Sequence, residues 1–263
     1  MLFLMPVFTL LGLFVGSFLN VCIDRLPLGK SIVKPPSHCS ACQQKLGVRD
    51  LVPLFSYLYL RGNCRYCQAH IPLRIPIVEG TTGLLFSLLY WHFGLGIELV
   101  ISLVYASLLA VIFVIDLENH LILDIITYPA MVLAIVFSFF WPGVGELTSL
   151  QVGSIKLSPL VSALAGGAFG LATQALPFVL TYRRGGMGFG DVKLGALVGL
   201  MTGLPLIILA VLAAWIVGGL VAAALLAFKI KQPKDPIPSG TFLAVSAMVI
   251  LVWGQLIWQW YLP

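Results

Sequence analysis

Four carboxylates stand at the ends of long apolar runs in this 263-residue sequence: Glu79, Asp116, Asp124 and Asp191. A charge at the centre of a bilayer costs at least about 2.5–3.5 kcal/mol, so an acid beside an apolar span needs a specific reason. Two carboxyl groups that share one proton can hydrolyse a peptide bond, because one takes a proton from water while the other donates one to the carbonyl oxygen. We therefore interpret Asp116 and Asp191 as a candidate catalytic pair.

Asp191 follows a glycine-rich stretch that begins at Gly185 and has further glycines at 186, 188 and 190. Glycine permits positive φ angles and the close approach of another backbone. A glycine-rich segment would therefore allow an extended substrate backbone to lie against the neighbouring acid. A flexible link is the simpler interpretation. A phosphate-binding or dinucleotide-binding loop would require a preceding β-strand, and the sequence predicts none there.

Asp116 closes the apolar run 108–115, and on its own it could be a polar cap where a span leaves the membrane. Asp124 is its main rival as the first acid of the pair. His120 could tune such a site, although a hydrogen-bonding surface histidine is the simpler interpretation. The four histidines form no HExxH pattern and no GxSxG occurs, so zinc-protease and serine-hydrolase chemistry lack a matching motif.

Two CxxC pairs, Cys39 with Cys42 and Cys64 with Cys67, predict a structural zinc site. Each CxxC turn can direct two thiolates at one ion, and two such turns complete a closed tetrahedral shell that leaves no open position for catalysis. The alternatives are two disulfides, redox chemistry or thiols without a ligand, and a cytoplasmic location argues against disulfides. Cys22 is left over and is interpreted as a small buried residue.

The elements that must position these residues are membrane spans. Hydrophobic residues make up 60% of the chain and charged residues 10%, against about 25% charged in ordinary soluble domains. The first 20 residues contain no Lys or Arg, so they predict a permanent span and not a cleaved signal peptide. We predict an all-α polytopic membrane protein with about eight transmembrane helices, at 2–21, 76–93, 97–115, 124–141, 159–181, 192–204, 206–228 and 241–261. A reentrant or half-length segment is the alternative for 192–204.

Charge tests this layout independently, because cytoplasmic links are enriched in Lys and Arg. The link 22–75 carries eight bases and two acids, and alternation places the links 116–123, 182–191 and 229–240 on its side. The opposite links contain a single base, Lys156. The net charge of +5 therefore reports topology, and no basic stripe with interleaved aromatics indicates a nucleic-acid partner. Both termini should face away from the cytoplasm, and all four acids should face it.

The expected organisation has three parts: a first span at 1–21, a cytoplasmic zinc-binding module at 22–75 and a transmembrane core at 76–263 that carries the acids.

In order and number, these features resemble the type IV prepilin leader peptidases, the bacterial branch of the GxGD membrane aspartyl proteases. The resemblance covers nearly the whole chain. It rests on residues 16–27, the two CxxC pairs, Pro53, Ser56, Tyr57, residues 60–62 and 74–79, Ile115, Asp116 and residues 188–193.

The resemblance implies a multi-pass protease of the bacterial inner membrane, with Asp116 and Asp191 as its catalytic pair at the cytoplasmic face. Its substrates would be prepilins or pseudopilins, whose basic leader is removed ahead of an apolar helix. Members with the four-cysteine loop commonly also methylate the new N-terminus from S-adenosylmethionine, so the resemblance implies that cofactor as well as structural Zn²⁺. Lys193 and Glu79 could position substrate or tune the pair, but a snorkelling Lys and a helix-start Glu explain them equally well.

Two other classes remain open at this stage. A protease of the presenilin or signal peptide peptidase type also uses GxGD, but it would not call for the cysteine module. A membrane transporter or assembly scaffold could use the acids for ion passage and a zinc-stabilised loop for shape.

Overall fold

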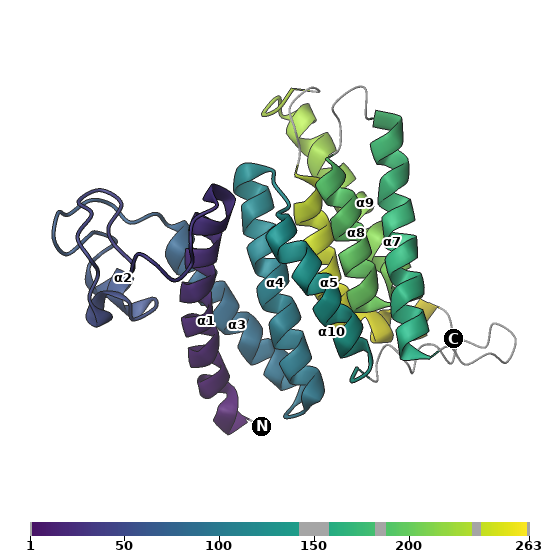
Figure 1. The fold of residues 1–263 in the computed structure, drawn as a ribbon, viewed down its shortest axis with the longest axis horizontal. Coiled ribbons are helices and arrows are strands. Elements are labelled where there is room, and N and C mark those ends of the chain that lie inside the picture. The colour runs from purple at the N-terminus through teal and green to yellow at the C-terminus, as the bar shows by residue number, and fades with distance from the viewer. Residues whose placement is uncertain (1, 142–157, 182–187, 233–237, 262–263) are drawn as a thin grey trace, which may run out of the picture. The chain divides into compact units, whose positions relative to one another are not determined.

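The structure, a computed structural model, describes residues 2–141, 158–181, 188–232 and 238–261, and in these ranges it is helical, as predicted. The only β-bridges there are two isolated ones, His38 with Lys45 and Asn63 with His70. The chain forms two compact units, Met1–Leu99 and Val100–Pro263 (Figure 1). The predicted division at residues 21 and 75 is a different one and stays a prediction. The longer helices are α1 (Met5–Arg25), α3 (Arg74–Phe93), α4 (Ile97–Asn119), α5 (Asp124–Ser138), α7 (Pro159–Thr181), α8 (Phe189–Thr202), α9 (Leu206–Ala227) and α10 (Ser239–Tyr261).

Close packing of α1 against α3 forms the framework of the first unit. Gly12 and Gly16, one turn apart on α1, face α3 so closely that a Cβ atom on Gly12 would lie 2.6 Å from the backbone oxygen of Thr82. Small residues at this spacing let apolar helices approach until their backbones touch. The Asn20 amide also donates a hydrogen bond of 3.1 Å to the backbone oxygen of Ile75.

The cysteine-rich segment between α1 and α3 is an irregular lobe of the first unit (Figure 1). It contains a short 3-10 helix, η3 (Val48–Asp50), and the five-residue helix α2 (Phe55–Tyr59). Glu79 is 5% exposed on α3 and accepts a 2.8 Å hydrogen bond from the backbone N–H of Leu54. This bond joins the lobe to the helices below it.

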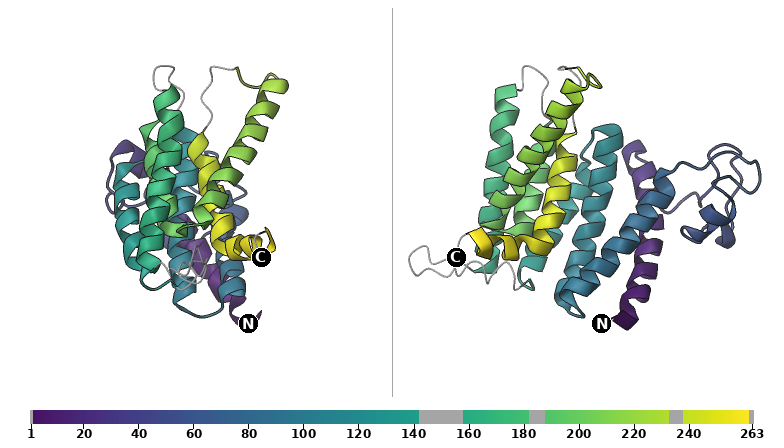
Figure 2. Two further views of the ribbon diagram at one scale, coloured as in Figure 1. Left: turned by 90° about the vertical axis from the view of Figure 1, so that its right-hand side faces the viewer. Right: turned by 180° about the vertical axis from the view of Figure 1, so that it is seen from behind.

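The second unit is built around α8. Among its residues from Asp191 to Thr202 only Lys193 is not buried, as expected for a helix that is apolar on every side. Gly166 and Gly170 of α7 meet Gly195 and Gly199 of α8, and a Cβ on Gly199 would lie 2.1 Å from the Gly166 oxygen. The two helices consequently run side by side in both views of the second unit (Figure 2).

Among the described residues, five helices are long and apolar enough to cross a membrane: α1, α4, α7, α9 and α10. Each of the eight predicted spans has a helix over it in the described ranges, but α5 has 15 residues and α8 has 14. At 1.5 Å per residue α8 is about 21 Å long, short of the ~30 Å hydrocarbon core. A multi-pass membrane protein is therefore supported, and a count of eight crossings stays a prediction. Several residues used above for the charge layout and the glycine stretch lie outside the described residues: Lys156, Arg183, Arg184, Gly185, Gly186 and Lys234.

Candidate active site and metal centre

Asp116 lies in the last turn of α4 and is 4% exposed. Its Oδ2 atom accepts two hydrogen bonds from Thr241, one of 2.6 Å from the backbone N–H and one of 2.8 Å from the hydroxyl. Thr241 belongs to the first turn of α10, where backbone N–H groups have no partner within the helix. The carboxylate supplies the acceptor that this N–H lacks, so the start of one helix fixes the acid at the end of another.

Asp191 lies in the first turn of α8 and is 8% exposed. Its carboxylate accepts hydrogen bonds from the Ser239 side chain and from the Gly188 backbone, and it lies near enough to Asp116 for the two charges to interact. The N-terminal end of a helix carries partial positive charge, which favours an anion there. The first turn of α10 thus holds both acids, through Ser239 and Thr241.

Ile122 fills the space beside the two acids. A Cβ atom on Gly190 would lie 2.9 Å from Cβ of Ile122, and one on Gly240 would lie 2.9 Å from Cδ1 of the same side chain. Gly240 is equally tight against Asp116, whose Oδ2 would be 3.0 Å from its added Cβ. The glycine that precedes Asp191 and the glycine that precedes Thr241 are therefore required by close approach.

The other candidate acids occupy different surroundings. Asp124 forms a 2.6 Å ion pair with Lys193, and its side chain is 55% exposed. The ammonium group of Lys193 also lies over the rings of Tyr128 and Phe189. Glu79 lies in the first unit, bonded to the lobe, and His120 is exposed just beyond α4. Asp116 and Asp191 combine burial with contact to α10, whereas Glu79 is equally buried but lies in the first unit.

Ser239 and Thr241 are site residues that the sequence analysis missed, because we placed the last span from 241 onward and treated 229–240 as a link. A usable signal was present. Ser239 follows Pro238 and precedes Gly240 and Thr241 ahead of an apolar run, and hydroxyl residues at such a position are typical of helix N-termini. The link also lay on the side predicted for the acids.

The four predicted zinc ligands converge within the lobe. The sulfur atoms of Cys39, Cys42, Cys64 and Cys67 all lie within 4.8 Å of one another, and those of Cys39 and Cys67 are 3.8 Å apart. Tetrahedral Zn²⁺ with Zn–S bonds of about 2.3 Å places its sulfurs about 3.8 Å apart. No disulfide joins the five cysteines, and Cys22 lies apart, buried on α1. The donor set therefore fits a thiophilic metal.

The two CxxC turns have the same backbone structure. Cys39 N–H donates to the Gln44 oxygen and Gln43 N–H to the Cys39 oxygen, and the same two bonds recur from Cys64 to Ala69 and from Gln68 to Cys64. Gln43 and Gln68 both have positive φ, at 58° and 59°. Such turns direct both sulfurs of a pair to one point, so the site is assembled from two equivalent halves.

Thiol ionisation in the cluster differs from one cysteine to the next. Backbone hydrogen bonds from Cys42 and Ala41 lower the pKa of Cys39 to about 6. The pKa of Cys67 is raised to about 12, because burial and its neighbours' thiols outweigh a backbone hydrogen bond at Ala69 that would lower it. A bound cation would stabilise thiolates at every position.

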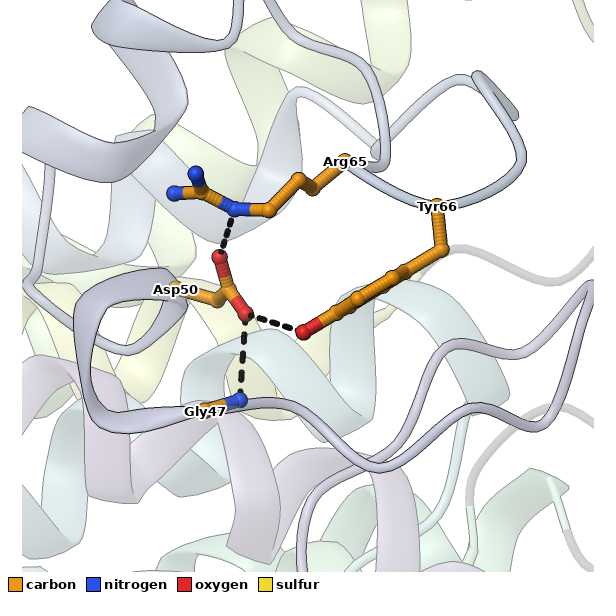
Figure 3. A network of polar contacts seen from close by, with 4 residues as sticks. All are labelled: Gly47, Asp50, Arg65 and Tyr66. Atoms are coloured by element: carbon orange, nitrogen blue, oxygen red, sulfur yellow. Dashed lines mark hydrogen bonds and ion pairs between the residues drawn. The ribbon is translucent and has the colours of Figure 1, made fainter.

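Asp50 connects the segment around Gly47 to Arg65 and Tyr66 of the second CxxC turn (Figure 3). Its carboxylate accepts hydrogen bonds from Arg65 at 2.6 Å, from the Gly47 N–H at 3.0 Å and from the Tyr66 hydroxyl at 3.3 Å. Desolvation by burial would raise the pKa of Asp50, but the bonds from Arg65 and Gly47 outweigh it and lower the pKa. Arg65 and Tyr66 lie between the second pair of cysteines, so the network clamps that CxxC turn onto η3.

Comparison with known proteins matches both parts of the chain. A family model described as the bacterial peptidase A24 N-terminal domain matches residues 10–93, and one described as the type IV leader peptidase family matches residues 103–223. Three similar curated proteins are each named prepilin leader peptidase/N-methyltransferase. That of Pseudomonas aeruginosa is 32% identical over 96% of this chain and 91% of its own length. That of Aeromonas hydrophila is 31% identical over 96% and 92%, and that of Bacillus subtilis 29% identical over 98% and 98%. No solved structure matches the chain.

Proposed function

This chain belongs to the type IV leader peptidase family, and from that premise we propose that it cleaves the basic leader from prepilins or pseudopilins with Asp116 and Asp191 as its acid–base pair. One observation carries the proposal. The first turn of α10 contacts both buried acids, Asp116 through Thr241 and Asp191 through Ser239.

The proposed mechanism needs no covalent intermediate. Two carboxyl groups close together cannot both ionise easily, so they hold one proton between them. The ionised member takes a proton from a water molecule as that water attacks the scissile carbonyl carbon, and the protonated member donates to the carbonyl oxygen. As the tetrahedral intermediate collapses and the C–N bond breaks, the carboxyl that took the proton from water gives it to the leaving amine, and the other carboxylate regains a proton from the hydroxyl of the intermediate. Thr241 and Ser239 act as positioning residues, which hold the carboxylates without touching the substrate.

Charge and apolarity together support the proposed membrane placement. The chain is a multi-pass protein of the inner membrane, and we place its acids and cysteine lobe on the cytoplasmic side, where the basic links lie. A prepilin presents a basic leader ahead of an apolar helix, so its scissile bond lies at the same boundary. Acids at helix ends, as Asp116 and Asp191 are, would meet that bond there.

We assign a structural zinc ion to Cys39, Cys42, Cys64 and Cys67, whose sulfurs fit a closed tetrahedral shell. The ion would hold the lobe together, since four protein ligands leave no position for substrate. We also propose N-methylation of the new N-terminus from S-adenosylmethionine, on the names of the relatives alone. No described residue is assigned to that cofactor.

The test of the acid pair is cleavage of a co-expressed prepilin by Asp116→Asn and Asp191→Asn variants. General acid–base groups contribute on the order of 10²–10⁴-fold, so each variant should lose leader removal while remaining folded in the membrane. Asp124→Asn is the matched control, because it removes an acid near the same helix ends that is paired with Lys193, and it should cleave normally. Substantial cleavage by either Asn variant would exclude that residue from the pair.

Mass analysis of a synthetic prepilin after incubation with the purified protein tests both activities. Loss of the leader is expected in every sample, and a further methyl group only where S-adenosylmethionine is present. An intact prepilin would instead favour the transporter or scaffold alternative.

A further inference from the structure

A groove of about 280 Å³ opens next to the acids in the second unit. Its walls come from α7, α9 and α10, and Ser239, which bonds to Asp191, lines one end. In the left view of Figure 2 the C-terminal half of α9 diverges from α7. Ser239 therefore links the groove to Asp191.

Gln174 marks the floor of this groove. The residue is 4% exposed, and its Oε1 atom has no hydrogen-bond partner. Its side chain packs over Gly195, which is one turn beyond Asp191 on α8. A buried amide oxygen without a partner is costly, more so in a membrane where water cannot reach it. An unused polar group at this position indicates a ligand that offers it a hydrogen bond.

The α9 wall is lined by small residues at helical spacing: Ala214, Gly218 and Ala222, with Gly219 beside them. Such a surface lets the backbone of an apolar helix approach closely. A Cβ atom on Gly218 would meet the ring of Phe242 at 3.2 Å, whereas one on Gly219 would meet nothing within 4 Å. The groove is consequently open at Gly219.

We propose that this groove binds the apolar segment that follows the scissile bond of the substrate, with the Gln174 amide bonded to a backbone group of that segment. The inference rests on the proposed function and specifies its substrate site. Gln174 lies seven residues before the end of α7, about 10 Å along the axis, so the groove receives the part of a bound chain that runs into the bilayer.

The chemistry of the lining favours this occupant over S-adenosylmethionine or a lipid headgroup. No described residue that lines the groove is charged, whereas both of those ligands carry charge. The volume is at the low end of small-molecule sites, about 300–1,000 Å³, and suits a few side chains of a longer segment.

The test compares Gly219→Leu with Ala224→Leu in the full-length protein, assayed for cleavage of a synthetic prepilin. A Cβ atom at 219 meets nothing within 4 Å and leucine favours the helix more than glycine, so the variant should fold. It should raise KM for the prepilin roughly tenfold, equivalent to about 1.4 kcal/mol, with kcat changed much less. Ala224 is exposed on α9 and does not line the groove, so Ala224→Leu should have the KM of the parent.

A second variant, Gln174→Met, separates binding from structure. It removes a buried amide with an unused oxygen at similar volume, so the thermal midpoint should not fall while KM rises several-fold. A fall in thermal midpoint with unchanged KM would make Gln174 a structural residue and overturn its part in the proposal.

Photocrosslinking identifies the occupant directly. A prepilin with a photoreactive apolar residue just after the scissile bond should form an adduct with α9 or with Phe242. Adducts elsewhere, together with parental KM for Gly219→Leu, would show that the substrate does not occupy the groove and would refute the inference. If the unmutated protein does not cleave the prepilin, that result contradicts the proposed function and not the assignment of the groove.

Discussion

At the scale of single residues, burial and hydrogen-bond partners distinguish the candidate acids from one another. Asp116 and Asp124 both end or begin an apolar helix, yet one is 4% exposed and bonded to Thr241 while the other pairs with Lys193 at the surface. An exposed ion pair contributes little to stability and is already satisfied. A buried carboxylate held only by neutral donors keeps an oxygen available for proton transfer.

Thr241→Val should lower kcat for leader removal about tenfold or more. The change keeps the shape and the backbone N–H but removes the hydroxyl that bonds Asp116 at 2.8 Å, and a hydrogen bond to a charged group is worth about 1.5–3 kcal/mol. The matched control is Thr202→Val on α8, whose buried hydroxyl bonds the Val198 oxygen and no acid. Equal losses of kcat in the two variants would mean that Thr241 acts only through stability.

At the scale of elements, glycine pairs and the cysteine turns determine which segments meet. Gly166 and Gly170 on α7, and Gly195 and Gly199 on α8, each stand four residues apart, and Gly12 and Gly16 on α1 repeat the spacing. A Cβ at these positions would collide with backbone, which cannot move aside as a flexible side chain can. Because Gly195 lies one turn from Asp191, the same contact sets the position of that acid.

Gly199→Ala should destabilise the second unit and reduce cleavage. Alanine favours the helix by up to about 1 kcal/mol, but its Cβ would lie 2.1 Å from the Gly166 oxygen, and overpacking of this kind costs about 1–3 kcal/mol. We expect the thermal midpoint in detergent to fall by several degrees. Gly96→Ala, where a Cβ would meet nothing within 4 Å, should leave it unchanged. Parental stability of Gly199→Ala would argue against this helix contact.

The cysteine lobe should contain about one zinc ion per chain, lost in Cys39→Ser or Cys64→Ser. Binding energy at a structural site is folding energy, so the lobe should also become sensitive to protease when the metal is removed. Elemental analysis and limited proteolysis measure the two effects. Cys22→Ala, a change outside the cluster, should retain the metal. Folded, purified protein without metal would rule out the structural-zinc assignment.

At the scale of the whole molecule, apolar helices and basic links together set the orientation. In the part of the chain that the structure describes, five helices can cross a membrane by length and composition, and the bases gather in alternate links of the predicted layout. Retention of Lys and Arg in the cytoplasm then determines which helix ends face inward. We therefore expect the acids at the end of α4 and the start of α8 to face the cytoplasm.

Cysteine labelling tests this orientation. In Leu95→Cys and Leu121→Cys, exposed residues that precede and follow α4 become thiols on opposite sides of the membrane. The reagent is a membrane-impermeant thiol label, applied to cells whose inner membrane is exposed but intact. It should label position 95, and position 121 only after the inner membrane is permeabilised. The parent protein measures any background from native cysteines. The reverse pattern would place the acids outside the cytoplasm.

Much of this protein is determined by features that act locally along the chain. Apolar runs predicted a helix at each of eight places, because burial of the backbone in lipid allows little else. The spacing within each CxxC pair brought two sulfurs together within one turn. The sequence also singled out Asp116 and Asp191, although their catalytic role stays a prediction.

Only the tertiary structure decided which residues meet across helices. Thr241 bonds Asp116 across 125 positions in the sequence, and Lys193 forms an ion pair with Asp124 across 69 positions. In the sequence, Asp116 and Asp124 are both polar residues at helix ends. Helix propensity and capping act within about one turn, so they do not distinguish the two. The pairing of helix faces depends on packing between segments, which set the burial of the acids, the contact of α7 with α8 and the groove beside Gln174.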